Sequence, residues 1–303
     1  MTGGSRPISI GIKTSPQAVD WPALEAAWAR IGEHAVFDSV WLNDHLTDIS
    51  RPRAGASWEA LTALAALSHH VPDKWVGHAV LSTTFRHPSV LAKAAAVLDH
   101  ATKGKFILGL GAGWFDLEHT PFGIPFPPMP ERFDRFESAV RVIRALGSPA
   151  AATEAGVTRP DRFYPLEGAT NDPPPLTPNG PPIWLGGQKA RGIALAAELA
   201  QGWLLPAVTP DKSPTNLVDF AERREAILVA LQAVGRDPGT FAFAAQVPAG
   251  TTAESRREAL AGGLEAARLG ATHVILGMPP RLGPAGVDAV AAEVAEPLRA
   301  KLG

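Results

Sequence analysis

Short apolar runs alternate with amphipathic helical patterns along this chain, and this alternation is the feature that most constrains its fold. Eight runs have the character of β-strands, at 8–13, 39–42, 76–82, 106–110, 182–185, 202–206, 241–247 and 273–277. Each is followed by a helical pattern, at 21–34, 57–70, 88–100, 131–146, 189–200, 214–234, 253–269 and 284–302. Strict strand–helix alternation predicts parallel pairing, and eight units is the number that closes a barrel.

An open, doubly wound α/β sheet shares this alternation and is the main alternative. In such sheets a glycine-rich dinucleotide-binding turn often follows the first strand. Here the first strand is followed by Thr14-Ser-Pro-Gln17, which contains no glycine. The sequence therefore predicts an α/β protein with the TIM (β/α)8 barrel fold. Ser57 and Ser213 are in suitable positions to cap the second and sixth helices.

The chain has 303 residues, of which 46% are hydrophobic and 19% charged. Barrels of this length are commonly one domain, so we expect residues 1–303 to form a single barrel domain. Two connections are unusually long, Trp114 to Pro130 after the fourth strand and Gly147 to Pro181 before the fifth. We expect the second to run over one mouth of the barrel, and both segments to roof the pocket.

The charge and the terminal sequence limit the partners. The formal net charge of −2 gives no reason to expect nucleic acid or an anionic membrane. The chain has no cysteine, which excludes disulfides and thiolate metal sites, and we expect no metal. The N-terminal residues form no apolar signal core, and no run is long enough to span a bilayer. We expect a cytoplasmic protein that acts on a small molecule, and a homodimer is a compatible assembly.

In a barrel of this type the active site lies at the carboxyl ends of the strands. The second strand is followed by Asn43, Asp44 and His45. We expect Asp44 to orient the imidazole of His45 for proton transfer or hydride-coupled chemistry, with His45 facing the mouth. The alternative is that this pair caps the following loop.

Two other strand ends carry candidate ligand-binding residues. The third ends in the hydroxyl side chains of Ser82 to Thr84, which suit a heterocycle. The fourth ends in a turn with Gly109, Gly111 and Gly113, where a flat ligand could lie directly against backbone. The alternative for that turn is a tight strand-to-loop connection without a ligand.

A pair of glycines, Gly186 and Gly187, follows the fifth strand and precedes a helix. Unpaired N–H groups and the positive end of the helix dipole make such a position a candidate anion site. Lys189 and Arg191 add positive charge beside it.

These segments resemble the bacterial luciferase-like superfamily, and most closely its branch that uses the deazaflavin coenzyme F420. The segments that carry the resemblance are Asn43–His45, Thr84–Pro88, Lys103–Trp114 with Glu118, Phe122–Pro127 with Arg132 and Phe133, and Pro182–Gly187. The resemblance extends from about Ile10 to Trp203, and the last third of the chain is matched only by architecture.

The resemblance implies a flavin-type ring at the C-terminal mouth, with His45 and Asp44 as the catalytic pair beside it. The implied cofactor contacts are Asp44, His45, Ala79, Val80, Ser82, Gly111, Ala112, Gly113, Gly186, Gly187, Gln188 and Lys189, and the substrate contacts are Trp114, Glu118 and Phe122. In relatives, a non-prolyl cis peptide at the position of Ala79–Val80 supports the ring. Residues 186–188 would bind the phosphate, although Gln188 stands where a serine is common.

The implied activity is hydride transfer between F420 and a small, apolar organic substrate. An FMN-dependent monooxygenase that uses reduced FMN and O2 shares the fold and the phosphate site, and it stays open as an alternative. A barrel that binds a flavin without turnover is a third alternative, from a different class. Trp114, Phe115, Phe122 and Phe126 favour an apolar substrate, cyclic or terpenoid-like.

Overall fold

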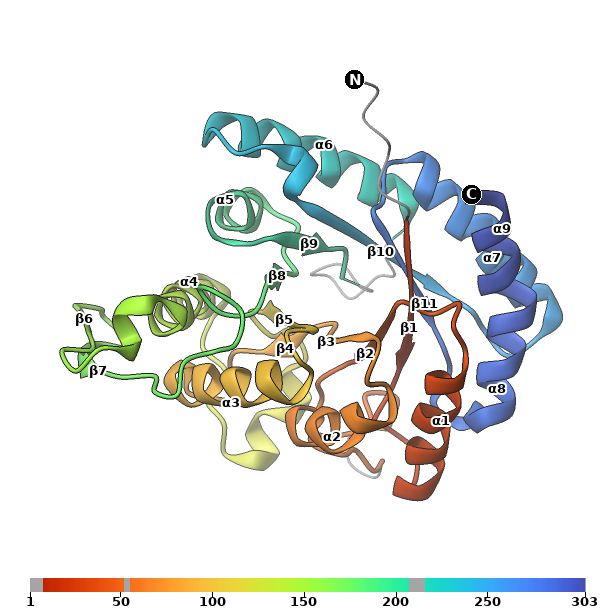
Figure 1. Ribbon diagram of the computed structural model, residues 1–303, viewed down its shortest axis with the longest axis horizontal. Coiled ribbons are helices and arrows are strands. Elements are labelled where there is room, and N and C mark those ends of the chain that lie inside the picture. Colours follow the sequence, from red (N-terminus) through yellow and green to blue (C-terminus); the bar gives the residue numbers. More distant parts are fainter. Residues whose placement is uncertain (1–7, 52–54, 207–215, 303) are drawn as a thin grey trace.

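The strands form one closed parallel barrel in a computed structural model, which describes residues 8–51, 55–206 and 216–302. The wall consists of β1 (Ser9–Thr14), β2 (Ser39–Leu42), β3 (Trp75–His78), β5 (Phe106–Gly111), β8 (Ile183–Leu185), β9 (Gly202–Leu204), β10 (Ala242–Pro248) and β11 (His273–Gly277). Their order is β3-β2-β1-β11-β10-β9-β8-β5, and the pairing of β3 with β5 closes the ring. Figure 1 shows the helices arranged around these strands. The predicted barrel is confirmed, and the open sheet is excluded.

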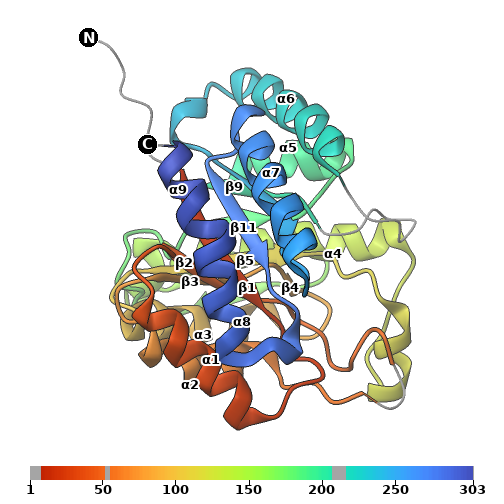
Figure 2. The same cartoon turned by 90° about the vertical axis from the view of Figure 1, so that its right-hand side faces the viewer.

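The helices are α1 (Trp21–Glu33), α2 (Ala60–Leu67), α3 (Pro88–Ala101), α4 (Met129–Gly147), α5 (Ala190–Leu199), α6 (Leu217–Ala233), α7 (Ala253–Arg268), α8 (Gly283–Val290) and α9 (Glu296–Leu302). Short 3-10 turns lie at Ser68–His70, Asp116–Glu118, Thr120–Phe122, Pro149–Ala152, Pro238–Thr240 and Pro280–Leu282. A π-helical turn, Ala291–Ala295, interrupts the single C-terminal helix that the pattern predicts, and Figure 2 shows the interrupted helix beside α7. Within the described ranges, no helix is long and apolar enough to cross a membrane.

Two helix caps can be compared with their predictions. Glu59, and not Ser57, caps α2, because its carboxylate accepts two backbone N–H groups of the first turn. The hydroxyl of Ser57 donates to the carbonyl oxygen of His45 at 2.8 Å, so it braces the loop after β2 instead. Ser213 lies outside the described residues, and Asn216 caps α6.

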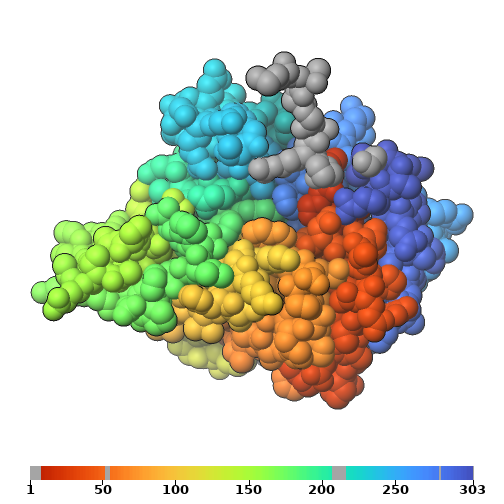
Figure 3. Space-filling view, in the orientation of Figure 1, coloured from red at the N-terminus to blue at the C-terminus, as the bar shows by residue number. Residues whose placement is uncertain are grey.

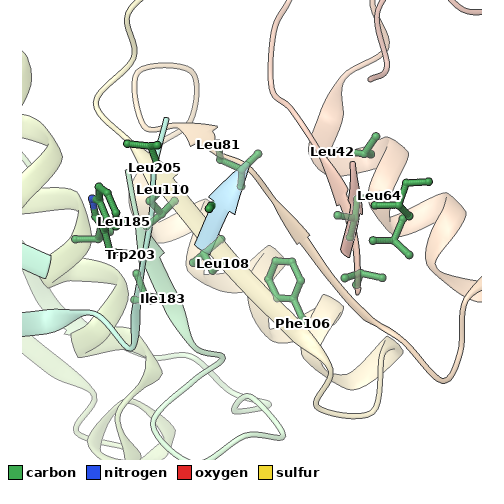
Figure 4. Close-up of a cluster of buried hydrophobic side chains, with 14 of the residues drawn as sticks. Leu42, Leu64, Leu81, Phe106, Leu108, Leu110, Ile183, Leu185, Trp203 and Leu205 are labelled. Atoms are coloured by element: carbon green, nitrogen blue, oxygen red, sulfur yellow. The ribbon is translucent and has the colours of Figure 1, made fainter. Parts of the chain in front are cut away.

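The outward faces of the strands pack against the helices and form the larger core. On β5, Phe106, Leu108 and Leu110 are fully buried, and Figure 4 shows Leu110 near Leu185 of β8 and Trp203 of β9. Complete burial of one such side chain contributes about 1.5–3 kcal/mol. This layer fixes the strand ends, and therefore the loops that start there.

The interior of the barrel is filled with side chains. Trp41 of β2 and Trp184 of β8 lie with their ring centroids 5.1 Å apart. Glycines on adjacent strands leave room for these indoles: a Cβ atom would lie 2.7 Å from Trp41 if added to Gly77, and 2.7 Å from Trp184 if added to Gly202. This pair of indoles, the tryptophan plug, closes the middle of the barrel. A ligand can therefore bind only at one of the two mouths of the barrel.

The third strand is interrupted where the pattern predicts one run over 76–82. The peptide bond between Ala79 and Val80 is cis, as the resemblance implied. The chain resumes as β4 (Leu81–Ser82), which pairs with the end of β5. The interruption therefore lies beside the glycine-rich end of β5.

The second long connection carries a hairpin, β6 (Val157–Arg159) and β7 (Leu166–Ala169), in the lobe at the left of Figure 3. Near its end, the backbone N–H of Thr177 donates to Asp99 in the last turn of α3. That turn is at the face opposite the carboxyl ends of the strands. Only the tip of the hairpin approaches the carboxyl ends of the strands, where Tyr164 contacts His87 at the start of α3. The expectation that this whole segment roofs the pocket is therefore wrong, because a helix-to-strand connection begins and ends at the opposite face.

Candidate active site

Asp44 lies at the carboxyl end of β2, and its side chain is completely buried. Its carboxylate accepts the backbone N–H of Ser82 at 2.9 Å and two N–H groups of Arg86, at 2.7 and 2.9 Å. This bidentate contact directs Asp44 away from His45. The expectation that Asp44 orients the imidazole is wrong, because Arg86 and the end of β4 hold its carboxylate.

The same arginine joins three elements. The guanidinium of Arg86 also donates to Glu59, the cap of α2. Burial raises the pKa of Glu59, but hydrogen bonds from the first turn of α2 and from Arg86 outweigh it and lower that pKa to about 2. Burial alone would lower the pKa of Arg86, yet its contacts with Asp44 and Glu59 raise it. Glu59 and Arg86 are therefore charged near neutral pH, and their contacts with each other and with Asp44 fix the loop that carries Asp44.

Glu118 is the residue that orients His45. Its Oε1 lies 3.0 Å from Nδ1 of His45, and its Oε2 accepts the backbone N–H of Leu46 at 2.8 Å. Glu118 is only 2% exposed. It was predicted as a substrate contact, but its carboxylate is turned to the loop after β2. We therefore give it the role of a positioning residue.

The other side of the His45 ring has a partly apolar environment. Trp114 and Phe115 meet it edge-on, with centroids 5.8 and 6.1 Å away. Within the described ranges Nε2 of His45 makes no hydrogen bond, so it is the ring nitrogen available to a ligand. The arrangement offers one oriented imidazole nitrogen beside aromatic side chains.

The glycines at the end of β5 make room for the residues at the interruption of the third strand. A Cβ added to Gly109 would lie 1.8 Å from the carbonyl oxygen of His78, and one added to Gly111 would lie 2.8 Å from Val80. Gly113 has φ +75°, a left-handed conformation that favours glycine. Packing within the protein thus explains the glycine pattern at Gly109 and Gly111, whether or not a ligand also lies there.

The start of α5 lies at the carboxyl end of β8. The backbone N–H of Gly186 donates to Leu110 at 3.0 Å, and the carbonyl of Gly187 accepts the indole N–H of Trp203 at 2.7 Å. Lys189 occupies the N-cap position without a side-chain hydrogen bond to the helix. Among the described residues, no side chain therefore caps the first N–H groups of α5, as the predicted phosphate site requires.

The two cations near this helix differ. Lys189 is exposed. Arg191 forms ion pairs with Asp134 at 2.9 Å and Glu137 at 3.1 Å, and its guanidinium lies over Phe133 of the same helix, α4. Arg191 is thus engaged by α4, and its predicted contribution to the anion site is not supported.

The remaining predicted contacts lie in the connection from β5 to α4. Ala112 packs against the core, Trp114 is half-buried beside His45, and Phe122 is 56% exposed. Phe126 is held between His119 and Arg132, at 4.2 and 3.7 Å from its ring centroid. Gln188, in the loop before α5, is partly exposed. Trp114 is the member of this group in contact with His45.

Three polar residues at the mouth are additions to the predicted site. Lys13, at the end of β1, donates to Oε1 of Gln246 on β10, and Gln246 donates to the carbonyl of Leu205. Asn43 has a buried Oδ1 without a hydrogen-bond partner in the described part of the chain. Asn43 was read as part of a motif and given no role. Strand alternation was the available signal, because Lys13, Asn43 and Gln246 stand at inward positions.

The sequence matches the luciferase-like monooxygenase family model over residues 10–297. The chain belongs to this family. Among curated relatives, an F420-dependent glucose-6-phosphate dehydrogenase of Nakamurella multipartita is 31% identical over 214 residues, 70% of this chain and 59% of the relative. A phthiodiolone/phenolphthiodiolone dimycocerosates ketoreductase of Mycobacterium tuberculosis is 29% identical over 225 residues, 69% of this chain and 56% of the relative. The matches thus span less than two thirds of these relatives.

Solved structures show the same fold. An F420-dependent secondary alcohol dehydrogenase, determined with an F420–acetone adduct, superposes with a TM-score of 0.76 over 97% of this chain and 99% of its own, at 17% identity. At that identity the likeness concerns the barrel alone.

Proposed function

We propose that this protein is an F420-dependent oxidoreductase that transfers a hydride between coenzyme F420 and a small, apolar organic substrate. The observation that carries the proposal is the hydrogen bond between Glu118 and His45 at the carboxyl ends of the strands, in a chain of the luciferase-like family. The F420-dependent dehydrogenase among its relatives supports the choice of cofactor.

The residues at the mouth fit a cofactor of this kind. Oδ1 of Asn43 is a buried acceptor that lacks a donor within the described ranges, and a ring N–H would satisfy it. At Gly186 an added Cβ would meet Val80 and Pro206 at no less than 3.5 Å, so packing among the described residues does not require glycine there. The start of α5 has no side-chain cap from the part of the chain that the structure describes, which suits a phosphate.

The chain's own residues have distinct roles in this proposal. When bound, F420 would supply the hydride chemistry at a ring carbon. His45 would exchange a proton with a substrate oxygen through Nε2, because Glu118 holds Nδ1. The carboxylate of Glu118 would fix the tautomer and stabilise the imidazolium form. Trp114 and Phe115 would keep water from the ring of His45.

A turnover assay tests this activity. The full-length protein is incubated with reduced F420 and a panel of small ketones, and with oxidised F420 and the matching alcohols, while the visible absorption of the cofactor is followed. We expect substrate-dependent oxidation or reduction of F420 that His45→Ala slows by about 100-fold or more. Tight F420 binding with no response to any substrate would favour the third alternative, a barrel that binds the cofactor without turnover.

The second candidate function is an FMN-dependent monooxygenase, which the family's description favours. Reduced FMN reacts readily with O2, whereas the reduced deazaflavin does so poorly. Oxygen uptake by the protein with reduced FMN and an apolar substrate, and none with reduced F420, would replace our proposal with this one.

A further inference from the structure

The side chain of Lys13 points into the barrel at its active mouth. Lys13 pairs in register with Trp41 of β2 and with Gly277 of β11. Residues in register on parallel strands face the same side, and Trp41 belongs to the interior cluster. Lys13 is also the last but one residue of β1, which places it at the carboxyl end of the strand.

Lys13 lies beside the tryptophan plug, towards the carboxyl ends of the strands. The indole N–H of Trp41 donates to Ser39, two residues nearer the start of β2, at 2.9 Å. The indole therefore leans towards the floor of the barrel and lies against Gly11 and Gly77. Lys13 and Gln246 are consequently polar inward side chains above an apolar layer.

The ammonium group of Lys13 has a neutral partner. It donates to Oε1 of Gln246, whose amide is oriented by its own bond to the carbonyl of Leu205 at 2.8 Å. In the part of the chain that the structure describes, Lys13 forms no ion pair with a carboxylate. Among the described residues, this leaves the charge and two of the three N–H donors of Lys13 without a partner in the protein.

A cation that is withdrawn from water without a counter-charge lowers the stability of the fold, and the side chain of Lys13 is only partly exposed. Burial lowers the pKa of Lys13 to about 8, so the group still carries its charge at neutral pH. A methionine would fill the same space without this cost. The charge therefore indicates a ligand more than a structural role.

We propose that Lys13, oriented by Gln246, binds an anionic oxygen of the substrate, a carboxylate or a phosphate, at the mouth of the barrel. This inference rests on the proposed function and narrows its substrate class. The substrate would combine an apolar part beside Trp114 and Phe115 with an anionic group at Lys13. An anionic oxygen of the cofactor has the same chemistry, and the experiment separates the two sources.

Lysine side-chain NMR of the full-length protein tests the site without an assay of turnover. The probes are acetate and inorganic phosphate, with acetamide as the neutral isostere of acetate. The Lys13 signal is assigned by its loss in Lys13→Met, and the signal of exposed Lys301 serves as an internal control. We expect a saturable shift of the Lys13 signal with both anions and none with acetamide. An unresponsive Lys13 signal, or equal shifts with acetate and acetamide, would overturn the proposal.

Gln246→Glu is the matched variant, because it keeps Lys13 and supplies the missing carboxylate within the protein. We expect it to weaken acetate binding at Lys13 by at least about tenfold. Wild-type anion affinity in this variant would count against the proposal.

Addition of saturating F420 shows whether the anionic oxygen at Lys13 belongs to the substrate or to the cofactor. A Lys13 response to acetate that persists with F420 bound supports a substrate subsite, and competition between them would overturn it. If F420 does not bind at all, the proposed function and the substrate assignment fail together. The acetate response in the free protein still reports separately on whether Lys13 binds anions.

Discussion

At the scale of single residues, the site depends on which groups form hydrogen bonds with the two ring nitrogens of His45. Glu118 holds Nδ1, and Nε2 makes no hydrogen bond within the described residues. The loop itself is fixed separately, by Asp44 and Arg86. In the proposed function, positioning and proton exchange are therefore divided among different side chains, and substitutions can separate them.

We expect His45→Ala to lower kcat by about 100-fold or more, the range of general acid–base catalysis, while the Kd for F420 stays within about threefold. Glu118→Gln keeps the size of the side chain but loses its charge, and we expect at least about a tenfold loss in kcat. Steady-state kinetics and cofactor titration measure both quantities. His69→Ala, at an exposed helix end, is the control. Equal losses of turnover and F420 affinity in His45→Ala would make His45 a binding residue instead.

Lys13→Met should make the protein more stable at pH 7, by roughly 1–3 kcal/mol. Burial places the pKa of Lys13 at about 8 in the folded protein, below its ordinary 10.5. Between these values the unfolded chain binds more protons, so wild-type stability rises with pH and the advantage of Met disappears towards pH 10.5. Urea unfolding at several pH values checks this, with Lys301→Met as the control. A pH-independent difference between wild type and Lys13→Met would show that charge burial is not its cause.

Residue types and order predicted the position of this site but not its hydrogen bonds. Asp44 and His45 are neighbours in sequence, yet their side chains have different partners. Glu118 belongs to the recognised motif, but its partner lies 73 residues away, a distance in sequence at which no local pattern indicates contact. Lys13 was missed because a lysine near a strand end resembles an ordinary exposed residue.

At the scale of elements, the ion pairs of Arg86 connect the loop before α3 to β2 and to α2. Arg86→Met would leave the carboxylate of Asp44 buried without its counter-charge, and we expect a loss of about 3–5 kcal/mol in the free energy of unfolding. Denaturant unfolding measures it. Arg135→Met is the matched control, because it breaks an exposed pair with Glu131 that contributes less than about 1 kcal/mol. A loss of stability no larger than that of the control would show that the ion pairs of Arg86 do not hold these elements together.

Gly187 lies where the loop after β8 touches α5. A Cβ there would be 3.1 Å from the Cα of Gly192, so a bulky residue would displace the helix start. We expect Gly187→Leu to weaken F420 binding by about tenfold or more. Ala194→Leu is the control, because it adds the same side chain at an exposed position of α5. Unchanged affinity in a folded Gly187→Leu protein would assign the phosphate elsewhere.

Periodicity predicted every strand of the wall, but it did not predict the interruptions. The residues at 76–82 read as one apolar run, because no change of residue type marks the interruption between β3 and β4. Ser57 is a good cap by propensity, and Glu59 takes that position because Ser57 donates to the loop of His45. Tertiary contacts thus decided the details near the site.

At the scale of the whole molecule, the barrel separates the packing of the chain from its chemistry. Trp41 and Trp184 close the interior, and the polar inward residues and the glycine-rich loops lie at the carboxyl ends of the strands. Closure of the wall through β3 and β5 brings the ends of distant strands to one mouth. The central claim of the proposed function is that this mouth binds F420 in preference to FMN.

A titration of the full-length protein with F420 and with FMN, each at low and high salt, tests that claim most directly. We expect F420 to bind more tightly than FMN, with a preference that shrinks as salt rises, because exposed Lys189 at the start of α5 attracts the more anionic tail. Micromolar or tighter binding of FMN, with no detectable binding of F420, would contradict the account.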